Sequence, residues 1–386
     1  MRAIVHRSSL IAAICLLSAM PCRAATDVAG LVSQLDVAVY TDILDNMLET
    51  RTGDNRGFLI PELSPAADHD LVRDRIYTWF DNLGLDASLD PFTFSSFTGM
   101  NNVIGVLPGR ITPGRVYIIG GHYDSVQNPG ADDNASGVAG VMEAARILAN
   151  QPLASTVMFV AWDGEERGLW GSYHWVWTND ESVVDGVVNL DMIAYNHNDD
   201  NIATVYGRAD WRAKWIAAAG RYAPDITVLE NTETLANSDH YPFQRYEDRP
   251  AGGIIENTGP SPNPYYHKIT DTVDTPGYID YEYAVSLLAS GVGLLAEEAD
   301  LLLPGDADND KTVGYDDLAI LAAHIGTAGS LNWTTGDFNA DGVVDAADYI
   351  ALKQNFGLSI APTRGSEIPE PGTVLLLASA PHWCCG

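Results

Sequence analysis

The chain is organised around Gly130-Ala131-Asp132-Asp133-Asn134-Ala135-Ser136-Gly137, in which two acids lie among small residues. An apolar run with helical spacing follows over residues 138–148, so the acids are predicted to lie in a tight loop where a helix begins. Gly130 and Gly137 are expected to supply the unusual backbone angles of that turn. By itself, such a loop is more typical of a turn or a helix cap than of a metal site.

Side chains that can bind metals follow three apolar runs, each of which is predicted to be a strand. His122 follows the run at 116–119, the pair Glu165-Glu166 follows the run at 156–161, and Asp191 follows the run at 187–190. Open α/β sheets bind ligands at the carboxyl ends of their strands, so these side chains are expected to meet at one edge. With His267 downstream, the pattern favours a hydrolase with two metal ions.

Apolar runs of strand length alternate with segments of helical periodicity, which predicts an α/β fold. We expect a three-layer sandwich around a mostly parallel sheet, followed by a small α-helical domain with two calcium loops. The predicted helices are 68–83, 136–148, 169–177, 211–222 and 279–303, and the predicted strands are 92–97, 103–107, 116–119, 156–161, 187–190 and 252–255.

Composition excludes some classes of partner. The 386 residues suffice for two or three domains, and the net charge of -31 argues against nucleic acid and anionic membrane surfaces as partners. The four cysteines, Cys15, Cys22, Cys384 and Cys385, lie at the two ends of the chain. Any metal in the body of the protein must therefore be held by histidines and carboxylates.

The first 25 residues read as a signal peptide. Basic residues from Arg2 to Arg7 precede an apolar segment, Leu10 to Met20, that is too short to span a bilayer. The alternative is a buried N-terminal helix. A signal peptide predicts a secreted, cell-surface or periplasmic protein with no membrane span after processing.

The segment from Gly305 to Ser359 contains nine Asp, and its pattern repeats. Two loops of twelve residues, each followed by an apolar helix, carry oxygen ligands at the spacing of calcium loops. The predicted ligands are Asp306, Asp308, Asp310, Thr312 and Asp317 in the first loop, and Asp337, Asn339, Asp341, Val343 and Asp348 in the second. The repeat resembles a dockerin module, which implies two calcium ions and a cohesin-like protein partner. An acidic linker would not explain the repeated register.

Four segments follow from these readings. Residues 1–25 are the signal peptide, 26–303 the catalytic domain, 304–359 the dockerin-like domain and 360–386 a flexible tail. Within the tail, Ile368-Pro369-Glu370-Pro371-Gly372 resembles the Pro-Glu-Pro sorting tails of some exported bacterial proteins.

Taken together, the motifs resemble the co-catalytic di-zinc aminopeptidase family, which also contains glutaminyl cyclases and glutamate carboxypeptidases. The resemblance covers roughly residues 95–300. It rests on His122-Tyr123-Asp124-Ser125, the loop at 130–137, Asp163-Gly164-Glu165-Glu166, Leu190-Asp191-Met192 and Ser238-Asp239-His240. It implies the zinc-exopeptidase fold, two zinc ions and a peptide substrate.

The resemblance also implies a role for each matched residue. Asp133 would bridge the two zinc ions, and the Asp133–Asn134 peptide bond would be cis. His122 and Asp191 would complete one zinc site, Glu166 and His267 the other, with Glu165 as the general base and Asp124 orienting the ring of His122. His240 competes with His267 for the last ligand position. The family's tyrosine near the Ser-Asp-His motif has no counterpart around Leu235, which would leave stabilisation of the transition state mainly to zinc.

The resulting prediction is an exported zinc exopeptidase, in particular an aminopeptidase. One alternative is a glutaminyl-peptide cyclotransferase, and another is a non-catalytic calcium-dependent binding or scaffold protein. The intact Glu165 argues against a non-catalytic scaffold. A carboxypeptidase is disfavoured because no arginine-rich patch stands out that would bind a substrate carboxylate.

Overall fold

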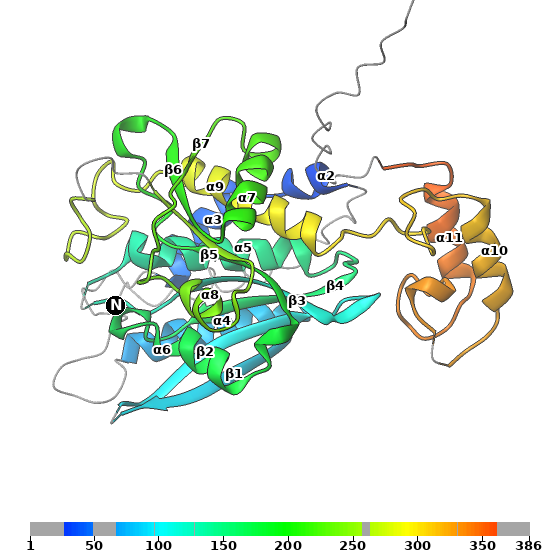
Figure 1. Ribbon diagram of the computed structural model, residues 1–386, viewed down its shortest axis with the longest axis horizontal. Coiled ribbons are helices and arrows are strands. Elements are labelled where there is room, and N and C mark those ends of the chain that lie inside the picture. The colour runs from blue at the N-terminus through cyan, green and yellow to red at the C-terminus, as the bar shows by residue number, and fades with distance from the viewer. Residues whose placement is uncertain are drawn as a thin grey trace, which may run out of the picture.

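The computed structural model describes residues 27–48, 67–95, 97–126, 128–256, 263–329 and 331–360. Within them, one mixed sheet of eight strands crosses the larger domain in the order β1-β2-β4-β3-β5-β8-β6-β7 (Figure 1). Its strands are β1 (Asp86–Phe94), β2 (Phe97–Leu107), β3 (Thr112–His122), β4 (Ser155–Trp162), β5 (Val184–Leu190), β6 (Ile202–Gly207), β7 (Thr227–Glu230) and β8 (Ala251–Glu256).

The four central strands, β4, β3, β5 and β8, run parallel. Antiparallel pairing is confined to the flanks, where β2 pairs with β1 and β4, and β6 pairs with β8. The parallel centre matters for function, because it brings the carboxyl ends of three adjacent strands to one edge.

Helices cover both faces of the sheet, which confirms the predicted three-layer α/β architecture. Alternate residues of β3 serve the two layers: Tyr117 and Ile119 join the larger apolar core, while Val116 and Ile118 join the smaller one. The larger core contains residues of α2 (Val28–Val32), α3 (Val37–Asp42), α4 (Ala67–Asn82), α5 (Gly137–Leu148), α7 (Ala209–Tyr222) and α9 (Tyr281–Glu298); α6 (Trp170–Thr178) and α8 (Tyr241–Glu247) pack on the smaller one.

Most predicted elements are confirmed within a few residues of their bounds. The predicted strand 92–97 spans two strands, because β1 ends at Phe94 and β2 begins at Phe97. Strands β6 and β7 were missed. They lie at the edge of the sheet, and β7 is short and largely exposed, so its sequence carries little buried apolar signal.

The C-terminal module contains α10 (Tyr315–His324) and α11 (Ala346–Asn355), and lies beyond the end of α9 (Figure 1). Its core includes Trp333, Phe338 and Leu352. Leu302 and Leu303 belong to the same apolar cluster, as does Ala154 of the larger domain. The module therefore packs directly against the sheet domain.

The predicted signal peptide and sorting-like tail lie outside the described residues, as do all four cysteines. In the part of the chain that the structure describes, no helix has the length and apolarity needed to cross a bilayer.

Candidate metal centre

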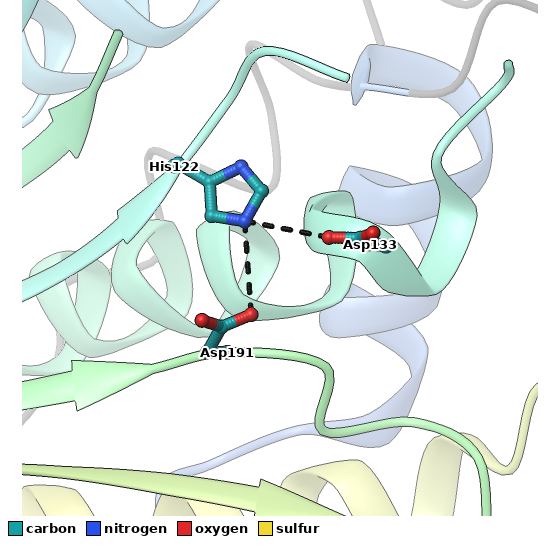
Figure 2. A group of neighbouring side chains, drawn as sticks. All are labelled: His122, Asp133 and Asp191. Carbon is teal, nitrogen blue, oxygen red and sulfur yellow. Dashed lines mark ion pairs between the residues drawn. The ribbon is translucent and has the colours of Figure 1, made fainter. Parts of the chain in front are cut away.

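The predicted ligands reach one place from separate elements. His122 is the last residue of β3, Asp191 directly follows β5, and Asp133 lies in the loop that precedes α5 (Figure 2). The pair Glu165–Glu166 forms a short 3₁₀ turn after β4. The edge predicted from the strand order is thus the edge at which these side chains meet.

Glycine permits the close approach of these elements. A Cβ on Gly137 would lie 2.4 Å from the Leu190 carbonyl oxygen, so α5 can contact the end of β5 only without a side chain there. Gly130 has the expected positive φ of 61°, whereas Gly137 has an ordinary helical φ of -64°. The expectation of an unusual backbone angle at Gly137 was therefore wrong. The absence of a side chain at Gly137 instead allows α5 to pack against the end of β5.

Asp133 lies between two histidines. His122 Nε2 is 3.4 Å from Asp133 Oδ1 and 3.6 Å from Asp191 Oδ1, the two pairs drawn in Figure 2. On the other side, His267 Nε2 is 3.2 Å from Asp133 Oδ2 and 3.2 Å from Glu166 Oε2. Two groups of three potential ligands therefore share one carboxylate.

Two residues that sequence reasoning gave no role hold the Asp133 loop. Asp271 accepts hydrogen bonds from the main-chain N–H groups of Asp132 at 2.8 Å and Asp133 at 3.3 Å. The Asn134 side chain donates to the Leu190 carbonyl oxygen at 2.9 Å and accepts from Met192 N at 3.1 Å. The Asp133–Asn134 bond is cis. Asp271 lies four residues after His267, and nothing in the neighbouring sequence predicts its contact with the Asp133 loop.

Asp124 supports the site differently from the expectation. The Nδ1 atom of His122 hydrogen bonds with the main-chain carbonyl of Asp124 at 3.1 Å, while the Asp124 carboxylate is 3.7 Å away. That carboxylate accepts hydrogen bonds from the N–H groups of Glu165 at 3.0 Å and Glu166 at 3.2 Å. Asp124 thus fixes both the ring and the turn.

A second buried group anchors the same turn. Asp163 Oδ1 is 2.8 Å from His69 Nε2, and its Oδ2 accepts from the Tyr123 hydroxyl at 2.9 Å. Burial lowers the pKa of His69, but the adjacent Asp163 carboxylate outweighs burial and raises it to about 9. His69 is thus a buried, positively charged partner of Asp163, which lies two positions before Glu165.

The cluster contains several buried carboxylates close together, which need positive charge to balance them. Burial would lower the pKa of His122, yet the carboxylates around it, Glu165 above all, raise this pKa well above its ordinary value. Burial raises the pKa of Glu165 well above its usual range, and that of Glu166 to about 7. Four carboxylates packed this closely are stable only with protons or cations between them.

The residues fit zinc. The donors are imidazole nitrogens and carboxylate oxygens, the ligands that zinc accepts in the absence of cysteine. Glu166 Oε1 is buried and accepts no hydrogen bond from any described residue, which leaves it available to a metal. His240, the competing candidate, is not part of either group of three; it is buried beside Gly253, and burial lowers its pKa to about 4.

A cleft of about 530 Å³ opens over the cluster. Its lining adds apolar and aromatic side chains to the metal-binding ones, namely Leu169, Tyr173, Met192, Ile255 and Tyr266. The Tyr266 ring stacks on His267 with centroids 3.7 Å apart. The segment around Leu235 contains no tyrosine for this site, but Tyr266, the residue before His267, lines the cleft.

The two acidic loops of the C-terminal module close on themselves as calcium loops do. In the first, oxygens of Asp306, Asp308 and Asp317 lie within 4.8 Å of one another. In the second, Asp337 Oδ1 is buried and accepts no hydrogen bond from the described residues. In both loops the last acid accepts an N–H from the second residue, as Asp317 does from Ala307 at 2.7 Å and Asp348 from Phe338 at 2.8 Å. Clustered carboxylate oxygens suit calcium.

Two regions of the chain match known protein families. Residues 102–285 match the model of Peptidase family M28, and residues 304–357 match the Dockerin type I domain. One similar sequence is a probable zinc metalloprotease of Pyricularia oryzae, 47% identical over 105 residues that cover 24% of this chain and 21% of that protein. Another is the aminopeptidase YwaD of Bacillus subtilis, 28% identical over 202 residues, or 49% of this chain and 43% of that protein.

Among solved structures, the Legionella pneumophila LapA aminopeptidase superposes with a TM-score of 0.61 at 23% identity, over 71% of this chain and 75% of that one. At this identity the likeness establishes the fold. The chain spans less than half the length of both curated relatives named above.

Proposed function

We propose that this chain, which carries a Peptidase family M28 domain followed by a dockerin type I domain, is a zinc-dependent aminopeptidase. The observation that carries the proposal is the position of Asp133, whose two oxygens face His122 and His267 on opposite sides. A carboxylate shared by two ligand groups is what a hydrolase with two metal ions requires. One zinc would be held by His122, Asp133 and Asp191, and the other by Asp133, Glu166 and His267.

Zinc, when bound, supplies a Lewis acid for the scissile carbonyl and lowers the pKa of water to about 7. We assign the proton transfer to Glu165, whose Oε2 lies 3.8 Å from His122 Nε2 and which belongs to neither ligand group. Its carboxylate takes a proton from the attacking water and gives it to the leaving amine. Asp124 and Asp163 hold the turn that presents it.

We assign to Tyr266 a hydrogen bond to the substrate oxygen on which negative charge develops. Burial and the nearby Asp133 and Glu166 carboxylates raise the pKa of its hydroxyl, which therefore remains a proton donor at neutral pH. This assignment replaces the expectation that stabilisation falls mainly on zinc. A donor already held beside the developing charge stabilises it at no further cost in reorganisation.

The side chains of the cleft disfavour a substrate with a terminal carboxylate. Zinc would neutralise three of its four carboxylates, and no lysine or arginine is among the described residues of its wall. A terminal carboxylate therefore meets no cationic side chain there, whereas a free amino group meets carboxylate oxygens. The same reasoning disfavours carboxypeptidase activity.

The test is a panel of matched substrates with the purified, zinc-loaded protein. We expect hydrolysis of leucyl peptides with a free amino group, no hydrolysis of their N-acetylated forms, and two zinc ions per chain by elemental analysis. Cyclisation of N-terminal glutaminyl peptides without hydrolysis of leucyl peptides would assign the chain to the glutaminyl cyclases instead. Binding without turnover of either class would leave a non-catalytic scaffold.

For the C-terminal module we propose two calcium ions, one in each loop, and a cohesin-like partner protein. The support is the match to the dockerin type I domain and the repeated loop geometry described above. Such a module, together with the signal-like N-terminus, favours an exported protein. Calcium titration followed by calorimetry measures the number of ions directly.

A further inference from the structure

An exposed group of aromatic side chains adjoins the catalytic cleft. It consists of Tyr173 and Trp177 on α6, Tyr246 on α8 and the neighbouring Arg245, and we call it the aromatic platform. Tyr173 and Trp177 are four residues apart on one helix, so they lie on the same face. Their rings stack at 5.2 Å, and the ring of Tyr246 meets both edge-on, at 6.0 Å from Tyr173 and 6.2 Å from Trp177.

The platform leaves large apolar surface in water. The exposed fraction is 55% for Trp177 and 47% for Tyr246, although most of the protein's large apolar side chains are buried. Contiguous exposed aromatic surface of this kind marks an interaction site more often than isolated exposed residues do. Tyr173 connects the platform to the metal centre, because it also lines the cleft.

Arg245 adds a positive charge to a strongly acidic protein. Its guanidinium lies 5.8 Å from the ring centroid of Tyr246 and 6.0 Å from that of Tyr241. It is exposed, and none of the described carboxylates lies within 4.0 Å of it, in contrast with Arg208, Arg212 and Arg221. Against a net charge of -31, it offers an anion a site beside the aromatic rings.

We propose that the aromatic platform binds the part of a peptide substrate that follows the scissile bond, selecting an aromatic side chain there and, through Arg245, the free carboxylate of a short peptide. The inference rests on the proposed aminopeptidase function and adds a substrate class to it. An extended peptide advances about 3.3–3.6 Å per residue. The rings of Trp177 and Tyr246 each lie one step from Tyr173, at 5.2 and 6.0 Å, which is about the length of two residues of extended peptide. We therefore place the side chain that contacts Trp177 and Tyr246 about two residues beyond the amino-terminal residue held in the cleft, at the third residue of the substrate.

The charges on the two sides complement such a peptide. The cleft offers carboxylate oxygens and, among its described residues, no cationic side chain, which suits the amino terminus, while Arg245 attracts the carboxyl terminus. A short peptide with an aromatic residue in third position would meet all three features at once, which no single amino-acid amide could do.

The experiment compares Leu-Gly-Phe with Leu-Gly-Gly, each with a free and an amidated carboxyl terminus. We expect the full-length protein to prefer phenylalanine in kcat/KM by about 3- to 10-fold, the range of one aromatic contact, mainly through KM.

Trp177→Ala should bring this ratio close to 1. Arg245→Gln should instead remove the preference for the free carboxylate over the amide, about 2- to 5-fold for an exposed charge. Tyr315→Ala, which removes an aromatic ring 78% exposed on α10, is the matched control and should retain both ratios.

A second measurement separates this inference from the proposed function. Calorimetry with a Leu-Gly-Phe analogue, in which a reduced bond replaces the first peptide bond, measures binding without turnover. If the protein hydrolyses nothing, the aminopeptidase proposal fails, and the platform stands only if the analogue binds and Trp177→Ala weakens it. Unchanged ratios and binding in Trp177→Ala would overturn the inference. So would retention on cellulose or chitin that Trp177→Ala abolishes, because the platform would then serve polysaccharide.

Discussion

The two candidate metal regions of this protein are built in opposite ways. The first calcium loop takes its ligands from a single run, Asp306 to Asp317, and closes with hydrogen bonds inside that run. The candidate zinc centre takes its ligands from the ends of three strands, a helix-capping loop and the distant His267. The geometry of a site formed by consecutive residues depends on the bound ion and on the conformation of one loop. The geometry of a site assembled from several elements depends on all the contacts that hold those elements in place.

The supports show the same difference. Around the zinc centre, Asp271, Asn134, Asp124 and Asp163 fix the positions of ligands through hydrogen bonds with groups far along the chain. In the calcium loops, by contrast, the N–H groups that bind the carboxylates of the predicted ligands come from the same loop. We therefore expect a substitution in the zinc centre to disturb several elements of the sheet domain. A substitution in a calcium loop should affect mainly that loop.

The largest effect is expected for Glu165→Gln, which tests whether roles in the assembled site can be separated. Glutamine keeps the shape of the side chain but cannot take the proton, so kcat should fall by on the order of 10²–10⁴ while zinc content is unchanged. Glu166→Gln is the matched neighbour and should lower zinc occupancy. Loss of zinc in Glu165→Gln with retention in Glu166→Gln would reverse the two assignments.

The next effect is the pH-dependent contribution of His69. Its folded pKa of about 9 exceeds the unfolded value of about 6.5, so its stabilisation is complete below pH 6.5 and is lost as pH rises through 9. The free energy of unfolding should differ between the wild type and His69→Gln by about 3 kcal/mol more at pH 6 than at pH 10. Urea unfolding of the zinc-loaded proteins at pH 6, 8 and 10 measures the difference. A difference independent of pH would show that His69 is neutral in the folded protein.

Calcium should act on the module and spare the catalytic centre. At a concentration one hundred times the dissociation constant, a bound ion stabilises the folded state by about 2.7 kcal/mol. Asp306→Asn should reduce the calcium-dependent rise in melting temperature, while Asp316→Asn, an exposed acid on α10 outside the predicted ligand set, should not. Calorimetry with calcium or EGTA, alongside zinc content and peptidase rate, is the measurement. A fall in zinc content on calcium removal would show that the calcium loops also affect the zinc centre, and would contradict this prediction.

The smallest effect concerns the contact between the two domains. Lys311 Nζ lies 2.5 Å from Asp300 Oδ1, and Asn309 donates to the same carboxylate at 2.9 Å. Because the pair is partly exposed, Lys311→Gln should lower the stability of the module by less than about 1 kcal/mol. Thermal unfolding of this variant beside Lys353→Gln, on α11, is the comparison. A larger loss would mean that the two domains unfold as one unit.

Local pattern was sufficient for much of this protein. The position of the strands before His122, Glu165 and Asp191, the loop at 130–137 and the two calcium loops were all visible as short motifs with fixed spacing. These features depend on backbone preferences and on neighbours within about a dozen residues, which a sequence displays directly.

Contacts between distant segments were decided only by the tertiary structure. It showed that Asp124 holds the Glu165–Glu166 turn through main-chain N–H groups, that Asp271 holds the Asp133 loop, and that Tyr266 faces the cleft. It also brought α6 and α8 together to form the aromatic platform. The physical reason is the same in each case: these pairings exist because packing places two segments side by side, and no periodicity within either segment encodes its partner.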